Sequence, residues 1–147
     1  MRKSAILACT AMGSAFVIGG TAAPSAAAEV DLQAGPAAAA VSWDVTGNPG
    51  DVVGAWGYGT LTYNSSNGRV EVAATVRDTK KDGYRAILKI QAEYQDNSVR
   101  SEEIADTTGS SDTSYGSGWF TFASDVDSIW VQECVASSCA SNWYQIW

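Results

Sequence analysis

The chain of 147 residues contains no histidine. Histidine is the commonest general base, so neither a Ser-His-Asp nor a Cys-His arrangement can be built here. A carboxylate pair is the remaining route to hydrolysis. Glu102 and Glu103 are adjacent in a strand-like run and would point to opposite faces, while Asp125 and Asp127 lie in a turn-like segment. Because nucleophile, base and cofactor motifs are all missing, we expect no enzymatic activity and no cofactor.

Positive charge is also scarce. Nine lysines and arginines face sixteen aspartates and glutamates, which gives a net charge of −7. Nucleic-acid binding needs a basic stripe, and anionic membranes repel an acidic surface. The sequence therefore predicts no nucleic-acid partner and no membrane partner after leader removal.

Long apolar runs are absent except near the start. Residues 1–28 have a basic beginning, a short apolar stretch interrupted by glycines, and Ala26-Ala27-Ala28 before Glu29. This pattern is typical of a cleaved signal peptide and predicts a secreted protein. A membrane helix and a lipid anchor on Cys9 are weaker alternatives, because the apolar run is too short for either.

Cysteine is rare as well, and only Cys134 and Cys139 follow the predicted leader. In an exported protein this spacing between two strand-like runs indicates a disulfide. Two thiolates without histidine fall short of the usual four zinc ligands. Calcium is the one metal with suitable ligands, the loop aspartates, but their spacing matches no EF-hand and we expect solvated side chains. These residues are Asp106, Asp112, Asp125 and Asp127.

Period-two alternation dominates what is present. Apolar residues alternate with polar ones over residues 70–76 and again over 84–94, as in half-buried strands. The polar linker between them ends in Asp82-Gly83, so we predict a central antiparallel hairpin. Leu88 belongs to its apolar face.

Shorter strands are predicted on both sides of this pair, including an edge strand over 99–104 and a terminal strand over 143–147. Residues 106–118 form the longest predicted loop. About seven to eight strands and no helix indicate an all-β, immunoglobulin-like antiparallel β-sandwich, with a small closed barrel as the alternative. We predict a signal peptide at 1–28, a flexible N-terminal arm at 29–40 and the β-sandwich domain at 41–147.

Tryptophan is more abundant than a small core requires. Trp43 and Trp130 are assigned to the core, whereas Trp56 and Tyr58 share one face of a glycine-rich strand and Trp143 and Trp147 share one face of the terminal strand. Indole and phenol rings suit contact surfaces that are part dry and part wet. The latter four are the candidate partner-binding residues of the domain.

The arm supplies two further candidates. Val30 and Leu32 are its only sizeable apolar side chains, and they alternate with polar residues. The arm is either a simple tether or a strand that docks on a partner.

The cleavable alanine-rich leader, the length of the mature chain, Gly57-Tyr58-Gly59 and the Cys134–Cys139 pair together resemble small exported immunoglobulin-like proteins of filamentous actinobacteria. Among these, the layout is similar to the bridging subunit of umbrella toxin particles. The resemblance implies an adaptor in an extracellular antibacterial toxin complex, with contact surfaces and no catalysis.

The expected function is accordingly a non-enzymatic secreted interaction module with an extracellular protein partner. One alternative is a carbohydrate or cell-wall binding module, in which Trp56, Tyr58 or Tyr115 stacks on sugar rings. A second alternative is a secreted peptidase inhibitor that presents the loop at 106–118. That loop contains no proline or cysteine to pre-organise it.

Overall fold

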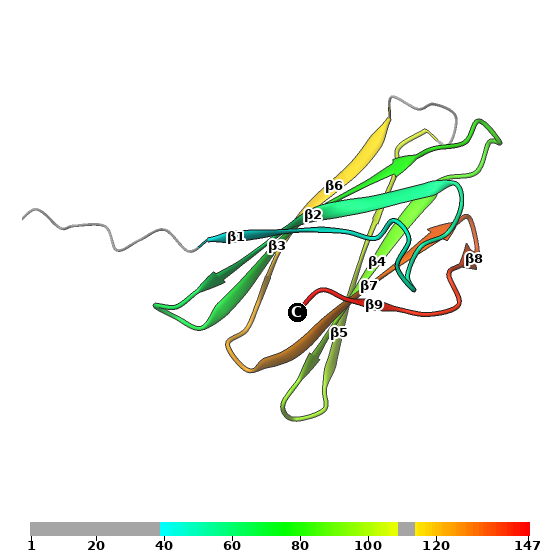
Figure 1. The fold of residues 1–147 in the computed structure, drawn as a ribbon. Coiled ribbons are helices and arrows are strands. Elements are labelled where there is room, and N and C mark those ends of the chain that lie inside the picture. The colour runs from blue at the N-terminus through cyan, green and yellow to red at the C-terminus, as the bar shows by residue number, and fades with distance from the viewer. Residues whose placement is uncertain (1–38, 109–113) are drawn as a thin grey trace, which may run out of the picture. The chain divides into compact units, whose positions relative to one another are not determined.

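The computed structural model describes residues 39–108 and 114–147. These residues form antiparallel strands and no helix (Figure 1). None of them belongs to a helix that could cross a membrane. The strands are β1 (Ala40–Asp44), β2 (Ala55–Asn64), β3 (Arg69–Asp78), β4 (Ala86–Tyr94), β5 (Val99–Ala105), β6 (Tyr115–Phe122), β7 (Val126–Val135), β8 (Ser138–Cys139) and β9 (Tyr144–Gln145).

Two sheets pack face to face, so the predicted antiparallel β-sandwich is confirmed. Sheet A has the order β1-β2-β3-β6, and sheet B has the order β5-β4-β7-β8 with β9 beside β7. The core comes from one face of each sheet, because every second side chain of a strand points inward. Val72 and Val76 of β3 and Leu88 and Ile90 of β4 are fully buried between the sheets.

The predicted hairpin between residues 70–76 and 84–94 is wrong, although both strands and their buried faces are right. β3 pairs with β2 and β6, whereas β4 pairs with β5 and β7. The linker at 79–85 crosses from one sheet to the other, with Gly83 at φ 80°. Each strand has an apolar face, and the two faces bury each other more completely across the sandwich than side by side in one sheet.

Several boundaries also differ from the prediction. β1 begins at Ala40, which the sequence assigned to the arm, and β6 begins at Tyr115, inside the predicted loop. The predicted terminal strand over 143–147 shrinks to the two residues of β9. The predicted edge strand is confirmed, since β5 ends sheet B.

The core assignment of the two tryptophans is half right. Trp43 is buried. Trp130 lies only partly buried on β7, where its indole N–H donates to the Ser128 hydroxyl at 2.9 Å.

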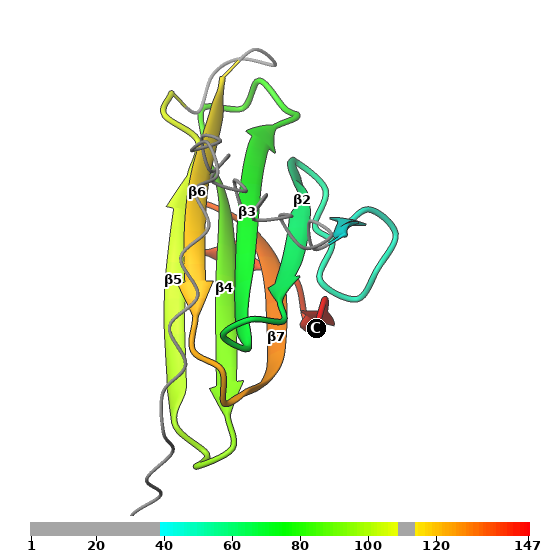
Figure 2. The same ribbon diagram turned by 90° about the vertical axis from the view of Figure 1, so that its left-hand side faces the viewer.

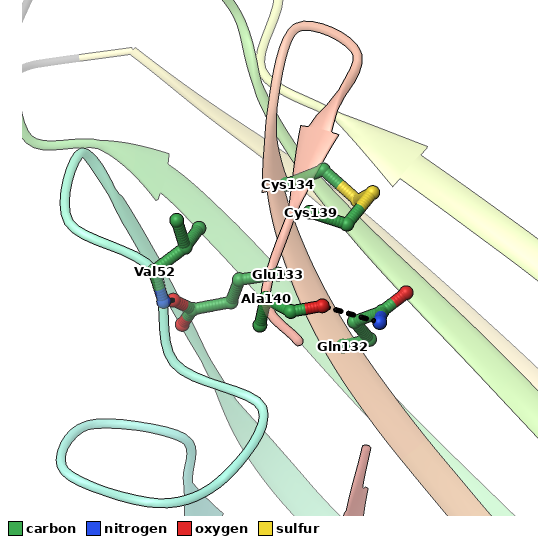
Figure 3. Close-up of a disulfide and its surroundings, with 6 residues drawn as sticks. All are labelled: Val52, Gln132, Glu133, Cys134, Cys139 and Ala140. Carbon is green, nitrogen blue, oxygen red and sulfur yellow. Dashed lines mark hydrogen bonds between the residues drawn. A yellow bond between two sulfur atoms is a disulfide. The ribbon is translucent and has the colours of Figure 1, made fainter. Parts of the chain in front are cut away.

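The predicted disulfide is confirmed between Cys134 on β7 and Cys139 on β8, which are directly opposite each other (Figure 3). The same hairpin is held by a hydrogen bond of 2.8 Å from the Gln132 side-chain amide to the Ala140 carbonyl. The bridge therefore fastens the chain beyond β7 to the sheet.

Candidate functional site

Four aromatic side chains lie on the outer face of sheet A and form what we call the aromatic face: Trp56, Tyr58, Tyr115 and Trp119. Register places Trp56, Arg77 and Tyr115 in one row across β2, β3 and β6. Two rows further, Thr60, Ala73 and Trp119 are aligned. Aromatic side chains of β2 and β6 thus lie on either side of β3, whose outward residues here are Arg77, Thr75 and Ala73.

Alternation on β2 explains why the rings point outward. Gly57 and Gly59 occupy the inward positions, so Trp56 and Tyr58 take the outward ones. A side chain at Gly57 would meet the Leu88 Cδ1 atom at 2.7 Å. One at Gly59 would meet the ring of Trp43 at 2.6 Å. The glycines therefore let the core close beneath the aromatic face.

Trp56 is fixed from several directions. Its ring centroid is 4.4 Å from that of Tyr58, with the planes tilted by 31°. Its indole N–H donates to Asp44 Oδ2 at 3.2 Å, and the Arg77 guanidinium lies 5.7 Å from the ring centroid. Burial would raise the pKa of Asp44, but hydrogen bonds from Thr46 and Trp56 outweigh it and lower that pKa. The carboxylate therefore stays charged and keeps the indole in place.

A shallow groove of about 550 Å³ runs beside this pair. Its walls include Trp56 and Tyr58, and its floor includes Thr60, Ala73 and Thr75. The floor presents hydroxyl and methyl groups at the level of the sheet. Such a surface can accept a flat apolar group against the rings and hydrogen bonds on the floor.

Trp119 and Tyr115 are the most open members of the aromatic face, with exposed fractions of 64% and 59%. The sequence analysis did not select Trp119 and placed Tyr115 in a loop. The available signal was the alternation of Trp119 with Phe120 and Phe122, whose inward direction turns Trp119 outward. An exposed indole of this kind on a sheet is a common mark of a contact surface.

The structure separates the four tryptophan and tyrosine candidates chosen from the sequence. Trp56 and Tyr58 lie together, but Trp143 lines a different groove of about 420 Å³ on sheet B, with Lys89 and Glu103. Trp147 stacks on Tyr63, with ring centroids 5.7 Å apart. The shared face predicted for Trp143 and Trp147 is wrong because the chain is regular only at β9 between them.

The remaining predicted positions are the two apolar residues of the arm and the loop aspartates. Val30, Leu32 and Asp112 lie outside the described residues. Among residues 39–108 and 114–147, no group of three potential metal ligands lies close enough to hold an ion. Asp106 is fully buried rather than solvated, and its Oδ2 accepts a hydrogen bond of 2.8 Å from Ser114.

Glu133 is a buried acid that sequence reasoning missed. It projects from β7 across the sandwich, where its carboxylate accepts a hydrogen bond from the backbone N–H group of Val52 at 3.0 Å (Figure 3). The same carboxylate accepts a second hydrogen bond, from the backbone N–H group of Gly57 at 2.6 Å. Burial raises the pKa of Glu133 to about 7, although these two N–H groups oppose the rise. The nearby Asp51 carboxylate adds to it. Glu133 thereby ties sheet B to the strand that carries the aromatic face.

Comparison with known proteins returns no match: no family model, no curated protein and no solved structure is significantly similar to this chain.

Proposed function

We propose that this protein is a non-catalytic adaptor that binds a protein partner through the aromatic face of sheet A. The supporting observation is that Trp56, Tyr58, Tyr115 and Trp119 share the outer face of sheet A with Arg77, which lies between Trp56 and Tyr115. Tryptophan, tyrosine and arginine are the residues that most often dominate binding energy at protein interfaces. Two of the rings stay largely exposed in the isolated domain, where water covers them at a free-energy cost.

The fixed position of Trp56 supports the same proposal. A ring already held by Asp44, Tyr58 and Arg77 loses little conformational freedom when a partner covers it. Trp119 adds a large exposed ring across the floor of β3. Trp56 is therefore pre-organised for binding and Trp119 is exposed, and both side chains lie on sheet A.

The resemblance to bridging subunits of umbrella toxin particles extends the proposal to an extracellular setting. In that role the domain joins other subunits of an antibacterial complex and performs no chemistry. The acidic chain, at −7, would favour a partner surface with basic groups around its apolar centre.

A co-purification experiment tests the adaptor function. The tagged protein is recovered from the culture fluid of its producer, as wild type, Trp119→Ser and Trp143→Ser. We expect a stoichiometric partner with wild type and Trp143→Ser, and at least about tenfold less with Trp119→Ser, since interface hot spots contribute about 1.4 kcal/mol or more. Wild type that elutes as a free monomer at every growth stage would refute the proposal.

The groove beside Tyr58 favours carbohydrate binding as a second candidate. Its apolar wall and the hydroxyl groups of Thr60 and Thr75 match the apolar face and hydroxyl edge of a sugar ring. Tryptophan fluorescence titration with neutral polysaccharides, for wild type and Tyr58→Ala, separates this candidate from the adaptor. Identical fluorescence with and without polysaccharide would exclude it.

A further inference from the structure

Among the described residues, β6 is the last strand of sheet A, and its main chain pairs with a neighbouring strand on one side only. β6 pairs with β3 and is the last strand in the sheet order. Along an antiparallel strand, the N–H and C=O groups of alternate residues point toward one neighbour and then away from it. The Thr121 carbonyl points away from β3, because it accepts a hydrogen bond of 2.9 Å from Arg100 on β5. By the same alternation, the main-chain groups of Ser117 and Trp119 point away from β3.

The hydrogen-bond directions followed from β1, at the opposite edge of sheet A, lead to the same assignment for β6. Val45 N–H donates to the Gly57 carbonyl at 3.0 Å, so odd residues of β2 face β1 and even ones face β3. Register then turns the even residues of β3 toward the even residues of β6, as in the pair Ala74 and Gly118. The odd residues of β6, from Tyr115 onward, are left at the open edge.

Two features that normally protect an edge, charged side chains and proline, are missing from the described strand β6 itself. Residues 115–122 contain no charged residue and no proline. β5, the neighbouring edge of sheet B, instead carries Arg100, Glu102 and Glu103. Charged residues discourage the addition of a further strand, and a long uncharged edge invites it. The two edge strands run along the same side of the sandwich (Figure 2), so the difference between them is local.

We propose that residues 115–119 of β6 accept an extended segment of a partner protein, which joins sheet A as a fifth strand. This inference extends the proposed adaptor function and names its mode of contact. A polypeptide is the occupant because alternating N–H and C=O groups at strand spacing match another extended backbone. Side chains of the added strand would alternate between the aromatic face at Trp119 and the sandwich interior at Ile104, so the segment is apolar at every second residue.

Arg100 sets one end of this acceptor site. Its guanidinium donates a hydrogen bond to the Thr121 carbonyl and lies 5.1 Å from the Phe122 ring centroid. It is also paired with Glu102 at 2.7 Å, which holds it in place. The added strand therefore ends before Thr121.

A synthetic peptide with the sequence of residues 70–76 serves as the probe, because β3 already pairs with β6 and has the required alternation. Binding is followed by amide NMR shifts and hydrogen exchange of the full-length protein. We expect the Ser117 and Trp119 amides to shift and to exchange at least tenfold more slowly with saturating peptide. N-methylation of the peptide at the positions of residues 71, 73 and 75 should abolish binding, whereas N-methylation at 72, 74 and 76 should not.

Two proline variants provide a matched pair on opposite edges of sheet A. Ser117→Pro removes an outward N–H of β6, and Ser42→Pro removes an outward N–H of β1. Both should fold, and only Ser117→Pro should lose the peptide. Equal binding of both methylated peptides, shifts confined to β1, or a wild-type dimer formed through β6 would each overturn the acceptor site. The co-purification with Trp119→Ser tests the adaptor function independently, so the acceptor site can fail while the adaptor function stands.

Discussion

Glycine at position 59 determines how closely β1 and the core can approach β2. A Cβ atom there would collide with the Ala73 carbonyl and with the Trp43 ring. We expect Gly59→Ala to destabilise the domain by about 2 kcal/mol or more, because the colliding groups are backbone and a buried indole. Thermal unfolding followed by circular dichroism measures the change. Thr60→Ala on the outer face is the control, and an equally small effect of both would contradict the packing described here.

Glu133 makes stability depend on pH. Its pKa is raised from 4.5 to about 7 by burial, so the folded protein binds this proton more tightly than the unfolded chain does. Its favourable contribution is therefore complete below about pH 4.5 and is lost as pH rises through 7. We expect the free energy of unfolding to fall by about 2–3 kcal/mol across that window. Urea unfolding at a series of pH values provides the measurement.

Glu133→Gln isolates this contribution from other titrating groups. The amide cannot ionise, so the wild-type curve minus the variant curve should slope downward between pH 4.5 and 7 and be flat above 7. The variant should be less stable at low pH, since one of the N–H groups of Val52 and Gly57 loses its acceptor. Parallel curves over the whole range would show that folding does not raise the pKa of Glu133.

The strands β3 and β4 face each other from different sheets. Leu88 on β4 is fully buried, while the next residue, Lys89, lies on the outer face of sheet B. We expect Leu88→Asp to cost about 3 kcal/mol or more and to abolish cooperative unfolding, because a carboxylate enters the core without a partner. Lys89→Asp should unfold cooperatively near the wild-type temperature. A stable Leu88→Asp domain would mean that the inner and outer faces of β4 are reversed.

The β7–β8 hairpin depends on its covalent bridge. Thiol titration of the denatured protein should find no free thiol at Cys134 or Cys139. Replacing both with serine should lower stability by about 2 kcal/mol, since closure of a short loop limits the unfolded chain by roughly that amount. Chemical denaturation under non-reducing conditions measures the loss. Two reactive thiols per chain, or an unchanged midpoint in the double variant, would contradict a stabilising disulfide.

Partner binding through the aromatic face can be distinguished from partner binding through the N-terminal arm. Deleting residues 29–38 removes Val30 and Leu32 but no residue of sheets A or B. We expect the melting temperature to be unchanged. If the arm is a docking strand, capture of the partner by the deletion variant should fall as strongly as for Trp119→Ser. A tether would leave capture at the wild-type level, and the aromatic face would then be the dominant contact.

Local periodicity in the sequence was enough to show which side chains of each strand share a face. Period-two alternation identified the buried sides of β3 and β4 and the outward direction of Trp56 and Tyr58, because this periodicity is a local property of extended chain. The disulfide was predictable for a similar reason, since only two cysteines follow the predicted leader and they lie close in sequence. No long-range information was needed for either conclusion.

Which strands are neighbours depends on contacts between segments that are distant in the chain. A polar turn between two alternating strands can close a hairpin or cross between sheets, and the choice depends on which arrangement buries both apolar faces. For that reason the sequence paired β3 with β4 wrongly and could not bring Tyr115 and Trp119 beside Trp56. The role of Glu133 could not be predicted for the same reason, because its carboxylate oxygens accept hydrogen bonds from N–H groups 76 and 81 residues away in the chain. Contacts between distant segments define the aromatic face, and local periodicity cannot encode them.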